Sequence, residues 1–309
     1  MAGGKNFYCY NGATPLSSAM FSVRYMLSDN PMEADMFKTY VGSENGNYLY
    51  RNNYCLPLGF MMDEDAIQAW TDSSAGRTGS LNALATALGC EENMISTVDC
   101  KTEAVEGDTS IDIPEDGYYY ADYTTCNSDS LNVNRNDGWN MNYSKTTHRY
   151  LLGLGKCKAG DRIHISNTNM ETIYFSVYKL NTDVVEQCYH TLNRQTMELT
   201  SMTDRSVEGT VDVKEAGRLV LSIPADAGWT LYVDGKETEI TPLADALIGV
   251  HLTEGAHTIR LHYTTPGLKA GAAISGGAIV LFAWSMLLVR RRRRVERVRE
   301  SVEENTGEV

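Results

Sequence analysis

Long basic segments are missing from most of this 309-residue sequence. Acidic residues outnumber basic residues by 40 to 27, the net charge is −13, and no run of Lys or Arg occurs before residue 290. Nucleic-acid binding depends on basic patches that displace counterions from phosphates. The sequence therefore predicts no nucleic-acid partner, and the same argument disfavours tight, nonspecific binding of anionic wall polymers.

Cysteine is sparse and scattered. The seven cysteines form no C-x-x-C pair, which disfavours a structural zinc site, and they are too few for a disulfide-dense scaffold. We interpret them mainly as small buried hydrophobic residues, and the odd number leaves at least one thiol unpaired. A single bridge such as Cys90–Cys100 is compatible with an oxidising compartment, but the sequence leaves its geometry open.

Familiar catalytic motifs are absent as well. The sequence contains no G-x-S-x-G, no G-x-x-x-x-G-K-[ST], no H-E-x-x-H and no complete EF-hand loop. His251, His257 and His262 lie in one predicted hairpin, but strand alternation puts His257 and His262 on opposite faces, which favours surface histidines over a metal site. The acids Asp63–Asp65 are typical of a solvated helix start rather than of acid–base catalysis. We predict no catalytic residue, metal or cofactor.

One long uncharged run lies near the C-terminus. Gly271–Val289 covers 19 residues, and at a rise of about 1.5 Å each it spans roughly the 30 Å core of a bilayer. A buried core helix is the alternative, which the length and the charged flanks disfavour. The positive-inside rule places the tail 290–309 in the cytoplasm and the bulk of the chain outside. The flanking cations are Lys269, Arg290, Arg291, Arg292, Arg293 and Arg294.

The N-terminus lacks the apolar core of a signal peptide. We therefore expect upstream membrane segments to export the chain, with Met1 as an internal or misassigned start. Gly271, Gly276 and Gly277 give the helix a small-residue face of the kind that lets membrane helices approach closely. We predict that this face meets the missing helices, the alternative being that glycine is simply common in such helices.

The hydrophobic pattern changes along the chain and predicts a mainly β protein with some α-helix. Strands are expected at 21–27 and 47–54 and helices at 63–71 and around 81–88, followed by alternation of period two from about residue 108. The predicted parts are a mixed α/β segment (1–100), an antiparallel β-sandwich module (101–182), a connecting helix (183–200), a second antiparallel β-sandwich-like module (201–267), the transmembrane helix (268–289) and a basic tail (290–309).

Tyrosine is unusually frequent, with 18 residues against six phenylalanines. Tyr118, Tyr119, Tyr120 and Trp139 fall in the first predicted sandwich, where exposed aromatic rings can stack on sugar rings. The alternative is that tyrosine suits half-buried strands, because its ring packs while its hydroxyl stays wet. These four residues are the candidate sugar contacts.

Several blocks of sequence resemble a known family. SIPADAGWTLYVDGKETEI and GVHLTEGAHTIRLHYTTPGLKAGAAIS, within residues 222–275, resemble the C-terminal signature of the bacterial YfhO family of membrane proteins. VRYMLSD and YLYRNNYCLPLGFM match the extracytoplasmic region of that family, so the resemblance covers nearly the whole chain. Ala225 departs from the pattern, since the family usually has an aromatic residue there.

The resemblance implies a multispanning protein with a glycosyltransferase-C-like region that transfers sugars from lipid-linked donors onto envelope polymers such as lipoteichoic acid. The catalytic acids of such enzymes lie in N-terminal membrane loops absent from this sequence, so none is carried over. We predict an accessory ectodomain with the last span of such a protein in the bacterial cell membrane. Its partners would be the bilayer, upstream helices and an envelope glycopolymer. The alternative is a membrane-anchored, non-catalytic carbohydrate-binding or structural module, and an autonomous enzyme is the weakest hypothesis.

Overall fold

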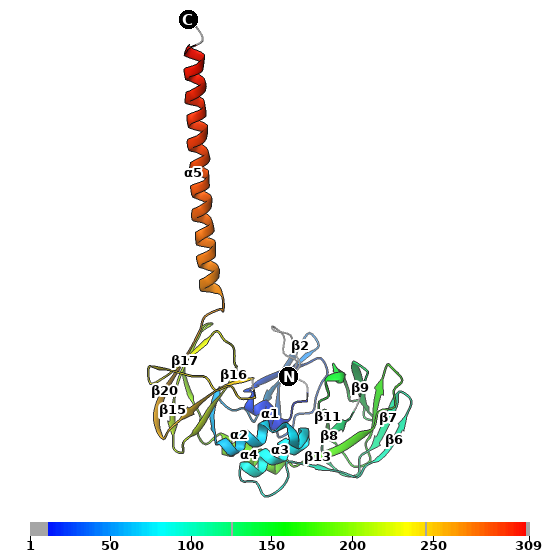
Figure 1. Cartoon of the computed structure of the whole chain (residues 1–309). Coiled ribbons are helices and arrows are strands. Elements are labelled where there is room, and N and C mark those ends of the chain that lie inside the picture. Colours follow the sequence, from blue (N-terminus) through cyan, green and yellow to red (C-terminus); the bar gives the residue numbers. More distant parts are fainter. Residues whose placement is uncertain (1–11, 125, 245, 307–309) are drawn as a thin grey trace.

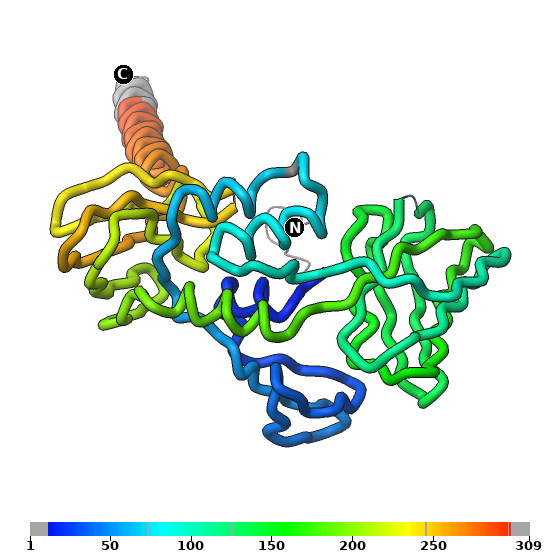
Figure 2. The backbone as a smooth tube through the Cα atoms, turned by 90° about the horizontal axis from the view of Figure 1, so that it is seen from below, coloured from blue at the N-terminus to red at the C-terminus, as the bar shows by residue number. Residues whose placement is uncertain are grey.

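The computed structural model describes residues 12–124, 126–244 and 246–306, and it confirms a mainly β fold with several antiparallel sheets. Two β-sandwiches lie at opposite ends of a body, with helices packed between them, and one long helix leaves the body from the second sandwich (Figure 1). Figure 2 shows the same arrangement from below, with a small sheet of residues 25–52 projecting from the middle.

The first sandwich consists of a five-stranded and a four-stranded antiparallel sheet. The five-stranded sheet has the order β10-β9-β12-β7-β6 and the other the order β11-β8-β13-β5. Their facing sides enclose a core that includes Ile111, Tyr119, Val133, Leu154 and Ile163. The strands are β5 (Ile95–Thr97), β6 (Lys101–Val105), β7 (Asp108–Asp112), β8 (Gly117–Tyr123), β9 (Ser130–Arg135), β10 (Asn140–Ser144), β11 (Leu152–Cys157), β12 (Arg162–Asn167) and β13 (Phe175–Leu180).

The second sandwich pairs a five-stranded sheet, β14-β15-β20-β17-β18, with a three-stranded sheet, β19-β16-β4. Strand β4 comes from the N-terminal segment and pairs with β16, so distant parts of the chain share this sheet. The predicted turn Asp234–Gly235 joins β17 to β18, and both residues have positive φ, as this type of hairpin requires. The strands are β4 (Gly59–Met62), β14 (Glu198–Met202), β15 (Ser206–Val213), β16 (Gly217–Pro224), β17 (Trp229–Val233), β18 (Lys236–Thr238), β19 (Leu247–Leu252) and β20 (Gly255–Tyr263).

Four α-helices and a small sheet fill the space between the sandwiches. The helices are α1 (Pro15–Met20), α2 (Glu64–Thr71), α3 (Gly76–Ala87) and α4 (Thr182–Leu192), and single 3-10 turns lie at Ser73–Ala75 and Thr146–His148. Their buried faces share one hydrophobic core with residues of β4, β8 and β16, namely Phe60, Tyr120 and Val220. The small sheet has the order β1-β3-β2, from β1 (Tyr25–Ser28), β3 (Asn47–Asn52) and β2 (Lys38–Glu44).

Local chemistry explains where the helices begin. The Asp63 carboxylate accepts a hydrogen bond from the backbone N–H of Ala66 at 2.6 Å, so Asp63 is the N-cap of α2, as its acidic start predicts. The Asn181 side chain caps α4 in the same way. Helix α4 ends at Leu192 and β14 begins at Glu198, so the connecting helix is shorter than the predicted 183–200. Helix α1 and strand β2 were not predicted from the sequence.

Helix α5 (Leu268–Thr306) contains the predicted span. Within Leu268–Val295 an 18-residue stretch has a mean hydropathy of 2.1, and none of that stretch is buried against the rest of the chain. Only four residues, 264–267, separate strand β20 from the start of α5. Since an extended residue covers at most about 3.6 Å, the end of β20 lies close to the bilayer surface when α5 spans the membrane.

Candidate functional site

A cleft of about 260 Å³ opens between the outer face of β8 and β11 and the small sheet β1-β3-β2. Its position follows from the topology, because β8 and β11 are neighbours in one sheet whose outer face is turned toward the middle of the body. Several elements contribute polar and aromatic side chains that can bind a polar ligand with apolar faces. These side chains belong to Glu33, Asp35, Lys38, Asn52, Tyr54, Tyr118, Arg135, Trp139, Tyr143 and Lys156.

The three consecutive tyrosines of β8 point in alternating directions. Tyr118 and Tyr120 lie on the outer face, whereas Tyr119 is completely buried in the core of the first sandwich. The Tyr119 hydroxyl donates to the carbonyl of Glu115 at 2.9 Å, and burial raises its pKa to about 12. All three border the cleft, but only Tyr118 presents a half-exposed ring to it.

Tyr118 is positioned by the loop that precedes β2. Its ring makes an edge contact with Phe37, with centroids 5.1 Å apart, and its hydroxyl hydrogen-bonds to the Asp35 carboxylate. Burial and this carboxylate raise the Tyr118 pKa, so the hydroxyl stays protonated. The Asp35 carboxylate also accepts backbone hydrogen bonds from Phe37 and Lys38 at 2.9 and 3.0 Å and pairs with the Lys38 ammonium at 2.5 Å. This side of the cleft is thus rigidly held.

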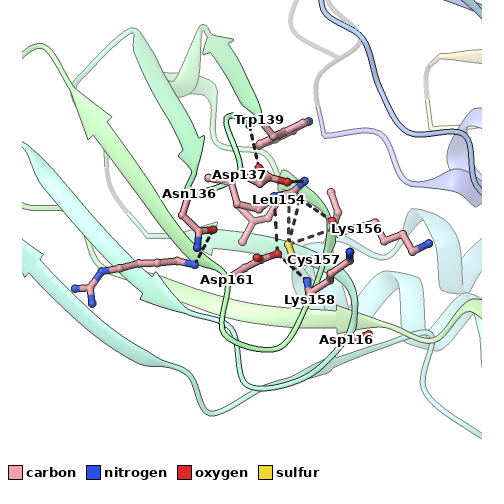
Figure 3. A network of polar contacts seen from close by, with 12 residues as sticks. Asp116, Asn136, Asp137, Trp139, Leu154, Lys156, Cys157, Lys158 and Asp161 are labelled. Atoms are coloured by element: carbon pink, nitrogen blue, oxygen red, sulfur yellow. Dashed lines mark hydrogen bonds and ion pairs between the residues drawn. The ribbon is translucent and has the colours of Figure 1, made fainter.

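Trp139 also borders the cleft and follows the turn between β9 and β10. Asp137 accepts the Trp139 backbone N–H at 3.0 Å (Figure 3). The Arg135 guanidinium stacks over the indole at 5.4 Å from its centroid. Gly155 lies beneath the ring at a bulge in β11, with φ of +81°. The ring is therefore fixed between a cation and a glycine, with part of its surface exposed to the cleft.

Polar contacts around Arg135 organise this side, and Figure 3 labels Asp137, Lys156, Cys157 and Asp161 among the residues of this network. Its guanidinium donates to Asp137 at 2.6 Å and to the carbonyl of Lys156 at 2.6 Å, and it lies 3.8 Å from Asp161. Burial raises the pKa of the adjacent Cys157 thiol to about 11, although Arg135 opposes this rise. The Arg135 Nε is buried without a hydrogen-bond partner in the described part of the chain. The thiol is neutral, and the positive charge of Arg135 is balanced by the carboxylates of Asp137 and Asp161.

The other candidate residues are engaged elsewhere. Glu64 lies in the first turn of α2, as predicted, and it pairs with Arg218 at 2.8 Å and with His251 at 2.7 Å. His257 binds Asp234, and His262 is exposed on β20. Within the residues that the structure describes, no group of three His, Cys, Asp or Glu side chains is arranged to hold a metal ion.

The predicted membrane residues all belong to α5. Lys269 lies in its first turn, and the five arginines Arg290, Arg291, Arg292, Arg293 and Arg294 follow the apolar stretch. Nothing lies within 4 Å of the positions where Gly271, Gly276 and Gly277 would carry a Cβ atom. The glycine face thus has no partner among the described residues, and its role in helix packing stays a prediction.

Sequence reasoning missed the polar half of the cleft. Glu33, Asp35 and Asn52 come from a segment distant in sequence from Trp139, and Arg135 was not singled out. The turn Asn136–Gly138 beside Arg135 and Trp139 was a usable signal, because a tight turn brings residues on its two sides together.

Comparison with known proteins identifies a family but no characterised relative. A family model described as bacterial membrane protein YfhO matches residues 1–275. No curated protein matches. A cupin 2 conserved barrel domain protein from Leptotrichia buccalis is 11% identical and aligns over 55% of this chain and 91% of its own, with a TM-score of 0.14. A quercetin 2,3-dioxygenase from Acinetobacter baumannii is 9% identical over 57% and 75%, also with a TM-score of 0.14. Scores this low carry no argument about fold or function.

Proposed function

This chain belongs to the bacterial YfhO family of membrane proteins, and on that premise we propose that its cleft binds a segment of a cell-envelope glycan. The bound glycan would be an acceptor polymer of the lipoteichoic acid type, held for sugar transfer from a lipid-linked donor by other parts of the protein. The observation that carries this proposal is the convergence of Tyr118 and Trp139 on one cleft with carboxylate, amide and guanidinium groups.

The chemistry of the cleft suits a sugar. Aromatic rings offer apolar faces to the C–H groups of a pyranose, and Tyr118 and Trp139 both line the cleft. Glu33 accepts hydrogen bonds, Lys156 donates them, and Asn52 does both, as hydroxyl groups require. The cleft volume of about 260 Å³ lies just below the range of about 300–1,000 Å³ typical of drug-sized ligands. This small volume limits the bound part of the polymer to a short segment.

Binding is favoured over catalysis at this site. The Asp35 carboxylate is already engaged by Lys38, by two backbone N–H groups and by the Tyr118 hydroxyl. A general acid or base must reach the reacting atom, and a carboxylate with these partners has little capacity left for a substrate. We therefore assign the cleft to recognition, with sugar transfer supplied elsewhere.

The same proposal sets the orientation of the chain in the membrane. Arg290–Arg294 favour a cytoplasmic tail, and this orientation would put both sandwiches and the cleft outside the cell. The short connection from β20 to α5 would then hold the body against the outer surface, within reach of polymers anchored there. Protease treatment of intact cells carrying a tail epitope tests this: we expect loss of the body and protection of the tail.

Glycan binding is tested with the full chain in nanodiscs, using purified lipoteichoic acid and a panel of soluble oligosaccharides. We expect Trp139→Ala to weaken binding by at least about fivefold, since a stacked aromatic ring contributes roughly 1 kcal/mol or more. The matched control is Tyr174→Ala, which removes a ring that is 75% exposed and does not line the cleft. Equal affinity of the two variants, or no binding by the unmodified chain, would refute the proposal.

A purely structural role is the second candidate, and one observation favours it. Tyr25, Leu27 and Val41 on the small sheet are 54%, 71% and 53% exposed, and exposed apolar groups of this kind commonly contact other protein surfaces. In this role the body would pack over neighbouring membrane segments. Leu27→Asp would then lower the recovery of assembled protein from membranes, whereas Trp139→Ala would leave it unchanged.

A further inference from the structure

Two cysteines distant in sequence meet inside the body. The Sγ atoms of Cys90 and Cys188 are 3.5 Å apart, and the residues are 4% and 0% exposed. A disulfide requires about 2.05 Å between sulfurs, so the two atoms need to approach by roughly 1.5 Å, within the reach of small side-chain and backbone shifts. Cys100, the partner that the sequence left open for Cys90, packs instead against the core of the first sandwich.

The position of the pair in the chain is distinctive. Cys90 follows Gly89, which ends α3 with φ of +88°, and Cys188 lies on the buried face of α4. The chain enters the first sandwich at β5 just after Cys90 and leaves it from β13 just before α4. The two sulfurs therefore meet where both connections of the first sandwich join the helices.

We propose that Cys90 and Cys188 are a disulfide-forming pair that joins the two connections of the first sandwich to each other. The bond would close a loop that contains every strand of this sandwich. It would prevent α3 and α4 from separating and so hold the wall of the cleft formed by β8 and β11. The proposal does not depend on which ligand the cleft binds.

The reaction is an ordinary thiol–disulfide exchange with a low-molecular-weight or protein disulfide as oxidant. One cysteine thiolate attacks the oxidant, forming a mixed disulfide and releasing one thiol. The second cysteine thiolate then attacks the mixed disulfide, so that the Cys90–Cys188 bond forms and a second thiol leaves. Two cysteine thiols are oxidised, one disulfide is reduced to two thiols, and the two protons lost by the cysteines end on those thiols.

The other described cysteines lack such a partner. Cys126 donates to the carbonyl of Ser128 at 3.3 Å, Cys157 contacts Arg135, and Cys55 donates to the carbonyl of Leu56 at 3.6 Å. Cys9 lies outside the described residues. In the part of the chain that the structure covers, Cys90 and Cys188 are the cysteines whose sulfurs are in contact.

Burial controls the rate of this reaction. Desolvation, reinforced by contact with Cys90, raises the pKa of Cys188, so little thiolate is present at neutral pH. The oxidant must also reach sulfurs that are covered in the folded chain. The experiment therefore includes incubation at stepwise increasing temperature below the melting point, which allows local opening.

The test uses the full chain in detergent, purified in reductant and then incubated with oxidised glutathione. Alkylation under denaturing conditions and peptide mass spectrometry should identify a Cys90–Cys188 cross-link with the loss of two hydrogen atoms. The oxidised chain should melt roughly 5–15 °C above the reduced chain, because closing a loop of about 100 residues constrains the unfolded state.

Variants separate this bond from other oxidation. Cys188→Ala should abolish both the cross-link and the oxidant-dependent rise in melting temperature, whereas Cys55→Ser should retain both. Full alkylation of Cys90 and Cys188 after incubation at every temperature would overturn the proposal, as would pairing of either residue with another cysteine. The alkylation state and the pairing of Cys90 and Cys188 are measured on the unmodified chain. These two results therefore test the proposal even if Cys188→Ala folds poorly.

Discussion

The two sandwiches differ in how completely their inner sheets are covered. Strands β4 and β16 of the second sandwich pack their outer face directly into the helical core through Phe60, Met62 and Val220. In the first sandwich, Tyr120 of β8 reaches the same core, but Tyr118 and the β11 bulge border the cleft instead. A binding site thus arises where the helical layer and the small sheet leave part of a sheet face uncovered.

Solvent-facing sheets show the contrasting pattern. Strand β15 alternates strictly, with Val207, Val211 and Val213 buried and Thr210 and Asp212 exposed. Strand β8 instead has three successive buried residues, 119–121, because both of its faces are covered. Strict alternation marks a sheet with one wet face, and a continuous apolar run marks a sheet between two layers.

The largest expected effect tests the covered face of β8. Tyr120→Ala removes a ring that is 8% exposed and should lower the free energy of unfolding by about 3–5 kcal/mol, as large aromatic truncations in cores do. The matched change Thr210→Ala on the exposed face of β15 should stay within about 0.5 kcal/mol. Urea unfolding of the full chain in detergent, with hydrogen exchange to locate the change, measures both. Similar losses in the free energy of unfolding for the two variants would contradict the distinction between covered and solvent-exposed sheet faces.

A second prediction compares glycines at the edges of the two sandwiches. A Cβ at Gly228 would lie 2.5 Å from the Tyr263 ring and 2.7 Å from the Thr264 carbonyl oxygen, so Gly228→Ala should cost about 1–3 kcal/mol. At Gly153, beside the cleft, the nearest atom is the Tyr143 hydroxyl at 3.4 Å. Gly153→Ala should cost less than about 1 kcal/mol. Thermal melting monitored by near-ultraviolet circular dichroism measures the difference, and a larger loss for Gly153→Ala would show that the first sandwich is the tighter one.

The smallest expected effect is the pH dependence of stability that the His257–Asp234 pair of the second sandwich contributes. A hydrogen bond to Asp234 at 2.8 Å raises the pKa of His257, and the Thr258 N–H together with His257 lowers the pKa of Asp234. The stabilisation that His257 contributes is therefore fully present below its ordinary pKa of about 6.5 and is lost as pH rises through the raised value.

At the acid end, the stabilisation from Asp234 is present above its ordinary pKa and is lost as pH falls through the lowered value. Because the pair is at the surface, the total should be below about 1 kcal/mol. Melting temperatures from pH 5.5 to 8.5 should decline less for His257→Gln than for the unmodified chain. His148→Gln, which replaces an exposed histidine of the first sandwich, serves as control, and an unchanged decline in His257→Gln would exclude the pair as its cause.

Much of the secondary structure could be predicted from local patterns. The start of α2 at Asp63, the stripe that ends α3 before Gly89 and the Asp234–Gly235 turn all depend on interactions within a few residues. The short helix α1 and the strand β2 were missed, because α1 is a single capped turn or so and β2 lacks clear alternation. Helix α4 is shorter than predicted, since the next sheet begins at Glu198.

The candidate site was only half predictable. Tyr118 and Trp139 could be selected as aromatic residues in strands, but Tyr119 could not be told apart from Tyr118 without knowing the register of β8. Asp35 and Arg135 became relevant only once the small sheet was placed against the first sandwich.

The sequence by itself determined the membrane helix, the alternating strands and the membership of the family, because each depends on composition or on residues close together in the chain. The tertiary structure decided the pairing of the N-terminal strand β4 with β16 in the second sandwich, the cleft and the contact between Cys90 and Cys188. Those features join residues roughly 100 or more positions apart, and such contacts depend on how whole layers pack, which local patterns do not specify.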